Sequence, residues 1–118
     1  MPSRNQKLGQ WGEEQACAFL RRNGFRIIER NFHATVGEID VVAAQGGDYY
    51  FIEVKTRETP EMATDLAVTE LKKHKLEKTM RHYCYRRDIK NVSLIMAGLL
   101  VEIRRPEKKL FFRFCVYY

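Results

Sequence analysis

A two-glycine turn between two strand-like segments constrains the fold of this chain more than any other feature. Residues 37–44 and 49–57 are rich in β-branched and aromatic side chains, and the stretch Gln45-Gly46-Gly47-Asp48 separates them. A Gly-Gly pair between such segments favours a two-residue β-hairpin, because both central residues of the favoured turn need a positive φ angle. The two segments are therefore expected to be neighbouring antiparallel strands.

This turn would place charged residues opposite each other on the two strands. Asp40 lies opposite Glu53 in this register, and Glu38 lies opposite Lys55. Opposed side chains have Cβ atoms about 4.5–5.5 Å apart, and side chains alternate between the faces of a strand, so all four charged groups share one face. A four-residue loop would keep them together, whereas a one-residue bulge would send one strand's charges to the other side. The opposite face is predicted to carry Ile39, Val41, Ile52 and Val54.

The charged face has two interpretations. It could be an ordinary solvated face, on which charged residues alternate with buried aliphatic ones. However, Val42 and Phe51 lie on the same face, which is therefore partly covered. A half-buried pair of carboxylates must be protonated, pair with a cation or bind a metal ion. The second interpretation is therefore a cation site between the strands.

Asp40, Glu53 and Lys55 are the residue types that metal-assisted phosphodiester hydrolysis needs. Carboxylate oxygens are hard ligands that suit Mg²⁺ or Mn²⁺, and such ions neutralise phosphate charge and acidify a bound water. A lysine beside the metal can orient the attacking water or stabilise charge that develops on the phosphate. Glu13 and Glu38 could complete the coordination or hold a water.

Composition and charge limit the class of protein. The 118 residues, 45% of them hydrophobic, are expected to form a single domain over residues 1–118. The net charge of +6 favours a polyanionic partner such as DNA. Three cysteines without a Cys-x-x-Cys pair argue against a disulfide framework and a zinc site. The longest apolar stretch, residues 92–101, is about half of a membrane span, so we expect no membrane segment. The odd cysteine count indicates a reducing compartment and the first residues lack an apolar run of signal-peptide type, so we expect a cytoplasmic protein.

Periodicity and turn residues place the remaining elements. A helix is expected from Leu8 to Leu20, because apolar residues recur every three or four positions and Asn23-Gly24 supplies a stop. The order αβββαββ indicates an α/β fold with a mixed central sheet flanked by helices. The other expected elements are a strand at 25–31, a connection at 32–36, a helix at 67–86 and strands at 92–103 and 110–117.

The second helix carries two lysines inside its apolar arc. The aliphatic stems of Lys72 and Lys75 could follow apolar surface towards solvent. Alternatively, their ammonium groups could emerge beside the charged hairpin face and contact a phosphate backbone. The arc itself is predicted to consist of Val68, Leu71, Leu76, Met80 and Tyr83.

An ordered set of motifs points to a known family. The motifs are Gly9-Gln10-Trp11-Gly12-Glu13-Glu14-Gln15-Ala16, Arg30-Asn31, Gly37-Glu38-Ile39-Asp40, Phe51-Ile52-Glu53-Val54-Lys55-Thr56-Arg57 and, more weakly, residues 67–76. On these segments the chain resembles the YraN-like proteins, an uncharacterised bacterial family with a restriction-endonuclease-like fold, similar to archaeal Holliday junction resolvases.

The resemblance implies the αβββαβ core of such nucleases and a role for each acid. Asp40 and Glu53 would be metal ligands, Lys55 the catalytic lysine and Glu13 the acid of the N-terminal helix. One departure is that residues 91–98 lack the Arg-Phe-Asp-like stretch usual at the start of the fourth core strand. This difference concerns substrate positioning more than metal binding.

The resulting hypothesis is a Mg²⁺- or Mn²⁺-dependent endonuclease that acts on branched or single-stranded DNA in repair or recombination. Arg57, Lys72 and Lys75 would contact phosphates without reading sequence. The alternative is a non-catalytic module that uses the same fold to bind nucleic acid or a protein. A homodimer is a further expectation, because related resolvases work as dimers and the strand at 110–117 offers an edge for self-association.

Overall fold

The computed structural model describes residues 3–58, 70–104 and 109–117, and within them the elements follow the expected order. The five strands form one sheet in the order β1-β2-β3-β4-β5, in which β3 and β4 are parallel and the other pairs antiparallel. The expected α/β class, with an αβββαβ core and a mixed sheet, is confirmed. The elements are α1 (Arg4–Arg22), β1 (Arg26–Ala34), β2 (Gly37–Gln45), β3 (Asp48–Arg57), α2 (Glu70–Arg87), β4 (Ser93–Arg104) and β5 (Lys109–Val116).

The predicted two-residue turn joins β2 to β3. Gly46 has a φ of 60° and Gly47 a φ of 85°, so both residues occupy the region that a side chain disfavours. Gln45 pairs with Asp48, and the ladder continues in the predicted register as far as Val41 and Ile52. This part of the sequence-based prediction is confirmed.

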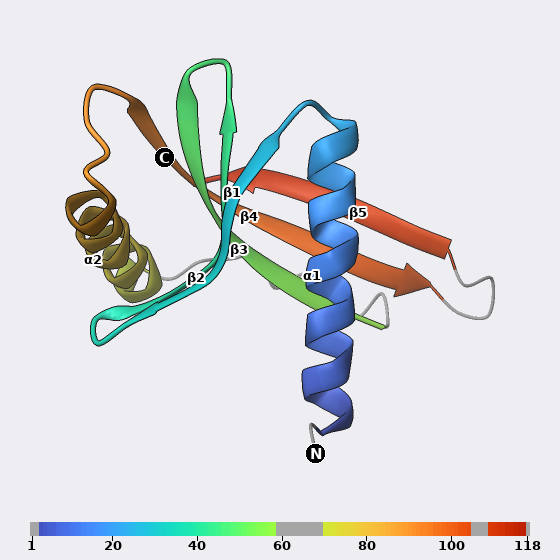
Figure 1. Cartoon of the computed structure of the whole chain (residues 1–118). Helices are drawn as coiled ribbons and strands as arrows, with labels where there is room; N and C mark the ends of the chain where they lie inside the picture. Colours follow the sequence, from blue (N-terminus) through green and yellow to red (C-terminus); the bar gives the residue numbers. More distant parts are fainter. Residues whose placement is uncertain (1–2, 59–69, 105–108, 118) are drawn as a thin grey trace.

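The two helices cover opposite faces of the sheet, and each covers its own hydrophobic cluster (Figure 1). Residues of one strand alternate between the clusters: Phe51 faces α2, and Ile52 faces α1. Glu53 and Lys55 follow the parity of Phe51, so they project to the α2 side. The α1 cluster includes Ala16, Cys17, Leu20, Val41, Ile52, Leu99 and Val101, and the α2 cluster includes Phe32, Ile39, Val42, Phe51, Leu76, Met80 and Tyr83.

A glycine lets α1 pack closely against the end of β3 and so places an acid at the pocket. A Cβ atom on Gly12 would lie 1.8 Å from Oγ1 of Thr56 on β3, so only glycine permits this approach. Glu13 comes next on the helix. At its start, α1 is capped reciprocally by Ser3 and Gln6, whose side chains each accept a hydrogen bond from the other's backbone N–H.

Three local predictions are wrong, each because of packing beyond the local sequence. β1 runs to Ala34, so the connection expected at 32–36 is reduced to a tight turn. Ile39 packs in the α2 cluster, although it was predicted on the same face as Val41. The cause is an irregular β1, which has a bulge after Ile27 and a left-handed residue at Asn31 (φ 55°). The β1–β2 hairpin therefore bends sharply (Figure 1). Leu71 is 76% exposed, because α2 packs through the later residues of its apolar arc.

The rest of that arc is confirmed, except Val68, which lies outside the described residues. Leu76, Met80 and Tyr83 are buried. β5 forms one edge of the sheet, as the self-association hypothesis requires. Neither α1 nor α2, the helices of the described residues, has the length and apolar composition of a membrane span.

Candidate active site

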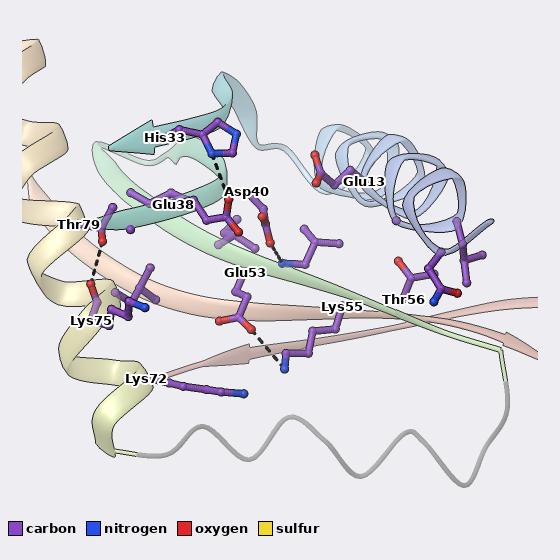
Figure 2. A pocket seen from close by; sticks show the side chains of 18 of the residues that line it. Glu13, His33, Glu38, Asp40, Glu53, Lys55, Thr56, Lys72, Lys75 and Thr79 are labelled. Carbon is purple, nitrogen blue, oxygen red and sulfur yellow. Dashed lines mark hydrogen bonds and ion pairs between the residues drawn. The ribbon is translucent and has the colours of Figure 1, made fainter. Parts of the chain in front are cut away.

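One pocket of about 1130 Å³ collects every residue that the sequence nominated for chemistry or phosphate binding. It lies between the N-terminal half of α1 and the N-terminal half of α2, over the ends of β2 and β3 (Figure 2). The nominated residues that line it are Glu13, Glu38, Asp40, Glu53, Lys55, Arg57, Lys72 and Lys75.

Asp40 sits where the β2–β3 ladder ends. The last paired residues are Val41 and Ile52, and beyond them the side chain of Asp40, not the β2 backbone, accepts a hydrogen bond from the β3 backbone. The N–H of Val54 donates to Oδ2 of Asp40 at 2.8 Å. This bond fixes the carboxylate, and its second oxygen accepts no hydrogen bond from the described residues. Asp40 is therefore held at the pocket with one oxygen available to a ligand.

The surroundings of Asp40 oppose its negative charge. The pKa of this carboxyl group is raised from 3.8 to about 6, chiefly by burial and in part by the charges of Glu13, Glu53 and Glu38. The hydrogen bond from Val54 lowers the pKa but does not offset these effects. A proton or a bound cation would stabilise this carboxylate. The sequence analysis predicted the same requirement for half-buried carboxylates on this hairpin.

Glu53 and Lys55 form an ion pair along one strand. Lys55 Nζ lies 3.4 Å from Glu53 Oε1, and the two side chains are only 19% and 32% exposed. Residues two apart in a strand share a face, which accounts for the pairing. The ammonium group of Lys55 therefore occupies the place beside Glu53 that a metal ion could take. The prediction that Lys55 lies opposite Glu38 is wrong, because the strands diverge before that point.

Glu38 has a partner that the sequence analysis missed. His33 on β1 pairs with Glu38 across the ladder, and its Nδ1 lies 3.1 Å from Glu38 Oε2. Both side chains are about two-thirds exposed at the rim of the pocket (Figure 2). Extending the first strand to Ala34 would have revealed this pair, because the tight turn then sets His33 opposite Glu38.

Glu13 reaches the pocket from α1. Its side chain is 18% exposed, and its carboxylate lies 3.8 Å from the guanidinium of Arg30. Burial raises the pKa of Glu13, although Arg30 and Asn31 counteract it. Arg30 is bound more closely by Glu14, at 3.0 Å. Glu13 thus adds negative charge to the pocket while its own nearest cation is shared.

The four acids line one pocket but do not form a single ligand cluster. Among residues 3–58, 70–104 and 109–117, no three His, Cys, Asp or Glu side chains are close enough to hold a metal ion. The reason is that each acid has its own partner: the Val54 N–H holds Asp40, Lys55 holds Glu53, His33 holds Glu38 and Arg30 holds Glu13.

Two of these acids nevertheless suit a divalent ion. Mg²⁺ keeps several waters and is commonly bound by one or two carboxylates together with substrate phosphates. Asp40 has an oxygen without a hydrogen bond from the described residues, and Glu53 needs only to exchange one cation for another. Burial, together with the charges of Glu13, Glu53 and Glu38, raises the pKa of Asp40, so a bound cation would favour its ionised form. Asp40 and Glu53 therefore fit Mg²⁺ or Mn²⁺, and Glu13 and Glu38 line the same pocket.

Basic side chains form the wall opposite α1. Lys72 and Lys75 are exposed on α2, and Figure 2 shows Lys72 extending towards the side of the pocket that holds Glu53 and Lys55. Arg57 lines the pocket at the end of β3, and its Nη1 donates to the carbonyl of Thr56 at 3.0 Å. The lysines thus face the pocket, as the phosphate-binding interpretation requires.

Comparisons with known proteins find a matching family model, similar relatives and a similar solved structure. The model of Uncharacterised protein family UPF0102 matches residues 12–114. A UPF0102 protein of Syntrophomonas wolfei is 39% identical over 101 residues, which cover 83% of this chain and 88% of the relative. Another, from Geobacter sulfurreducens, is 36% identical over 104 residues, covering 87% and 81%. The solved structure of Hjc, a Holliday junction resolvase from Archaeoglobus fulgidus, is 25% identical with a TM-score of 0.49, covering 88% of this chain and 72% of that one.

Proposed function

The chain belongs to Uncharacterised protein family UPF0102, the YraN-like family that its motifs resemble, and we propose that it hydrolyses phosphodiester bonds in DNA with Mg²⁺ or Mn²⁺ held by Asp40 and Glu53. The observation that carries the proposal is the electrostatic state of Asp40. Its pKa is raised to about 6 beside three glutamates, in a pocket that also contains Lys55. Perturbed carboxylates in a cleft are typical of catalytic sites.

Each residue would have a defined task. A bound Mg²⁺ or Mn²⁺ would neutralise phosphate charge and lower the pKa of a water molecule. The N–H of Val54 orients the Asp40 carboxylate, so its second oxygen faces a ligand. Lys55 leaves Glu53 and contacts either the attacking water or the phosphate oxygen on which charge develops. Glu13 and Glu38 would hold waters at the sides of the pocket.

DNA is the substrate class that the charge distribution favours. The chain carries a net charge of +6, and Lys72, Lys75 and Arg57 line the pocket next to the acids. Basic side chains beside an acidic centre attract a phosphate backbone while the acids retain the metal. Branched or single-stranded DNA in repair or recombination is the substrate that follows from the family resemblance.

A second candidate is a non-catalytic module that binds nucleic acid or protein on the same fold. The observation that favours it is the Glu53–Lys55 ion pair, in which the chain itself supplies a cation to the acidic pocket. A pocket already neutralised in this way could serve stability alone.

A cleavage assay distinguishes the two candidates. Purified protein is incubated with nicked, flapped, four-way and single-stranded DNA in Mn²⁺ and, in parallel, in excess EDTA. Cleavage of at least one of these substrates is expected with Mn²⁺ and none with EDTA. Binding without cleavage across all four substrates would favour the module, and cleavage that survives EDTA would exclude a metal-dependent centre.

Replacing the pocket lysines should weaken DNA binding and its salt dependence. The double variant Lys72→Gln/Lys75→Gln is expected to reduce the slope of log K against log salt by about 2 and affinity roughly 10-fold or more in ~0.1 M salt. Lys78→Gln/Lys90→Gln is the matched control, because it removes the same charge from exposed lysines that do not line the pocket. Fluorescence anisotropy over a salt series measures both values. Equal slopes for the two double variants would show that binding does not involve this wall.

A further inference from the structure

A buried tyrosine hydroxyl beside the pocket has no assigned role. Oη of Tyr117 is inaccessible to solvent and has no hydrogen-bond partner among the described residues. Buried polar groups without a partner are rare in folded proteins, and an unpaired group at a ligand site often has its partner only when the ligand is bound. The location of this hydroxyl decides whether that explanation applies here.

Tyr117 is anchored above a glycine of β4. Its backbone N–H donates to the carbonyl of Met96 at 2.7 Å, which fixes the chain just beyond β5. A Cβ atom on Gly98 would lie 2.0 Å from Tyr117 Oη and 2.8 Å from its Cζ. The phenol therefore occupies the space that any side chain at position 98 would fill.

This space adjoins Glu53. Gly98 pairs with Glu53 in the parallel β3–β4 ladder, and paired residues of parallel strands project to the same face. The hydroxyl consequently lies on the α2 side of the sheet, over the β4 residue that neighbours Glu53. The pKa of Tyr117 is raised to about 12, chiefly by burial and in smaller part by the negative charges of Glu53 and Cys115. The phenol is therefore an O–H donor on the same face of the sheet as the Glu53 carboxylate.

We propose that Tyr117 is a positioning residue for the metal site, whose hydroxyl donates a hydrogen bond to the Glu53 carboxylate when Glu53 exchanges Lys55 for a metal ion. This inference rests on the proposed function. One oxygen of Glu53 would bind the metal and the other would accept from Tyr117. Ligating carboxylates are usually held by such hydrogen bonds, which fix their orientation. The unpaired state of the hydroxyl belongs to the metal-free protein, in which Glu53 leans towards Lys55.

Tyr117→Phe tests the proposal because it removes one oxygen and keeps the ring. Tyr117→Phe is titrated with Mn²⁺ alone, and the free ion is monitored by electron paramagnetic resonance. Its dissociation constant for Mn²⁺ should be roughly 10- to 100-fold higher than that of the wild type. The melting temperature of the metal-free variant should be equal or higher, because an unpaired buried hydroxyl is lost without loss of packing. Tyr85→Phe is the control, since the Tyr85 side chain is 86% exposed.

The outcomes separate this inference from the proposed function. Wild-type affinity for Mn²⁺ in Tyr117→Phe would refute the positioning role and leave the metal site standing. A metal-free Tyr117→Phe protein that melts several degrees lower would also refute it, because the hydroxyl would then have a structural partner. Absence of saturable Mn²⁺ binding in the wild type would overturn the proposed function and this inference together.

Discussion

Asp40→Asn is expected to stabilise the metal-free protein while abolishing its DNA cleavage. The pKa of Asp40 is raised from 3.8 to about 6, chiefly by burial. At about 1.4 kcal/mol for each pH unit, keeping this group ionised lowers the free energy of unfolding by ~3 kcal/mol at neutral pH. Asparagine has nearly the same shape, keeps an oxygen for the Val54 N–H and carries no charge. The variant removes the cost of burying the Asp40 charge and, at the same time, the carboxylate that would bind the metal ion.

The gain in stability should depend on pH with a defined sign. Asp40 titrates near 3.8 in the unfolded chain and near 6 in the folded protein, so the folded state binds more protons between these values. The wild type therefore loses stability relative to the variant as the pH rises from about 4 to about 6. The difference between the two proteins should be close to zero below this window and constant above it.

Urea unfolding in EDTA at several pH values measures this difference directly. Asp88→Asn is the matched control, because the Asp88 side chain is 82% exposed and lies away from the pocket. Other titrating groups are common to wild type and variant and cancel in the comparison. An Asp40→Asn protein that is less stable than wild type at pH 8, or one that still cleaves DNA with Mn²⁺, would contradict the role given to this residue.

Lys55→Met should separate catalysis from metal binding. Removing a donor that stabilises charge in the transition state commonly lowers rates ~100- to 1000-fold, and we expect a loss of this size in DNA cleavage. The affinity for Mn²⁺ should be unchanged or higher, because Glu53 no longer has Lys55 as a competing partner at 3.4 Å. Methionine retains most of the apolar stem, so packing around the 19% exposed side chain is preserved.

Single-turnover cleavage and Mn²⁺ titration, carried out on the same preparation, provide the two values. Glu53→Gln is the informative comparison, because it should lose both activities. Loss of Mn²⁺ binding in Lys55→Met would mean that the lysine supports the fold of the pocket, and an unchanged cleavage rate would remove it from the chemistry.

The parts of the site that follow from local rules were predictable from the sequence. Gly46-Gly47 determines the turn, and the turn determines the register as far as Val41 and Ile52. Strand parity then places Glu53 and Lys55 on one face. These rules nominate residues of β2 and β3, while helical periodicity and the family resemblance add Glu13 on α1 and two lysines on α2. The structure brings all of them to a single pocket.

The parts that failed depend on where regular structure stops. The alternation of side chains along a strand predicted Ile39 on the wrong face. This rule takes no account of a left-handed residue, Asn31, on the neighbouring strand. It also predicted a Glu38–Lys55 pair, because nothing local marks the divergence of β2 and β3 at Asp40. The hydroxyl of Tyr117 lies over Gly98, the residue paired with Glu53, because Gly98 has no side chain to occupy that space. That relation requires the order of strands in the folded sheet.

The most direct test is a titration of the metal-free wild-type protein with Mn²⁺ at pH 7.5, followed by calorimetry. The account predicts one saturable site in each chain, with binding lost in both Asp40→Asn and Glu53→Gln and retained in Asp88→Asn. Binding that is absent from the wild type, or that persists undiminished when Asp40 and Glu53 are both replaced, would show that these carboxylates do not hold a metal ion.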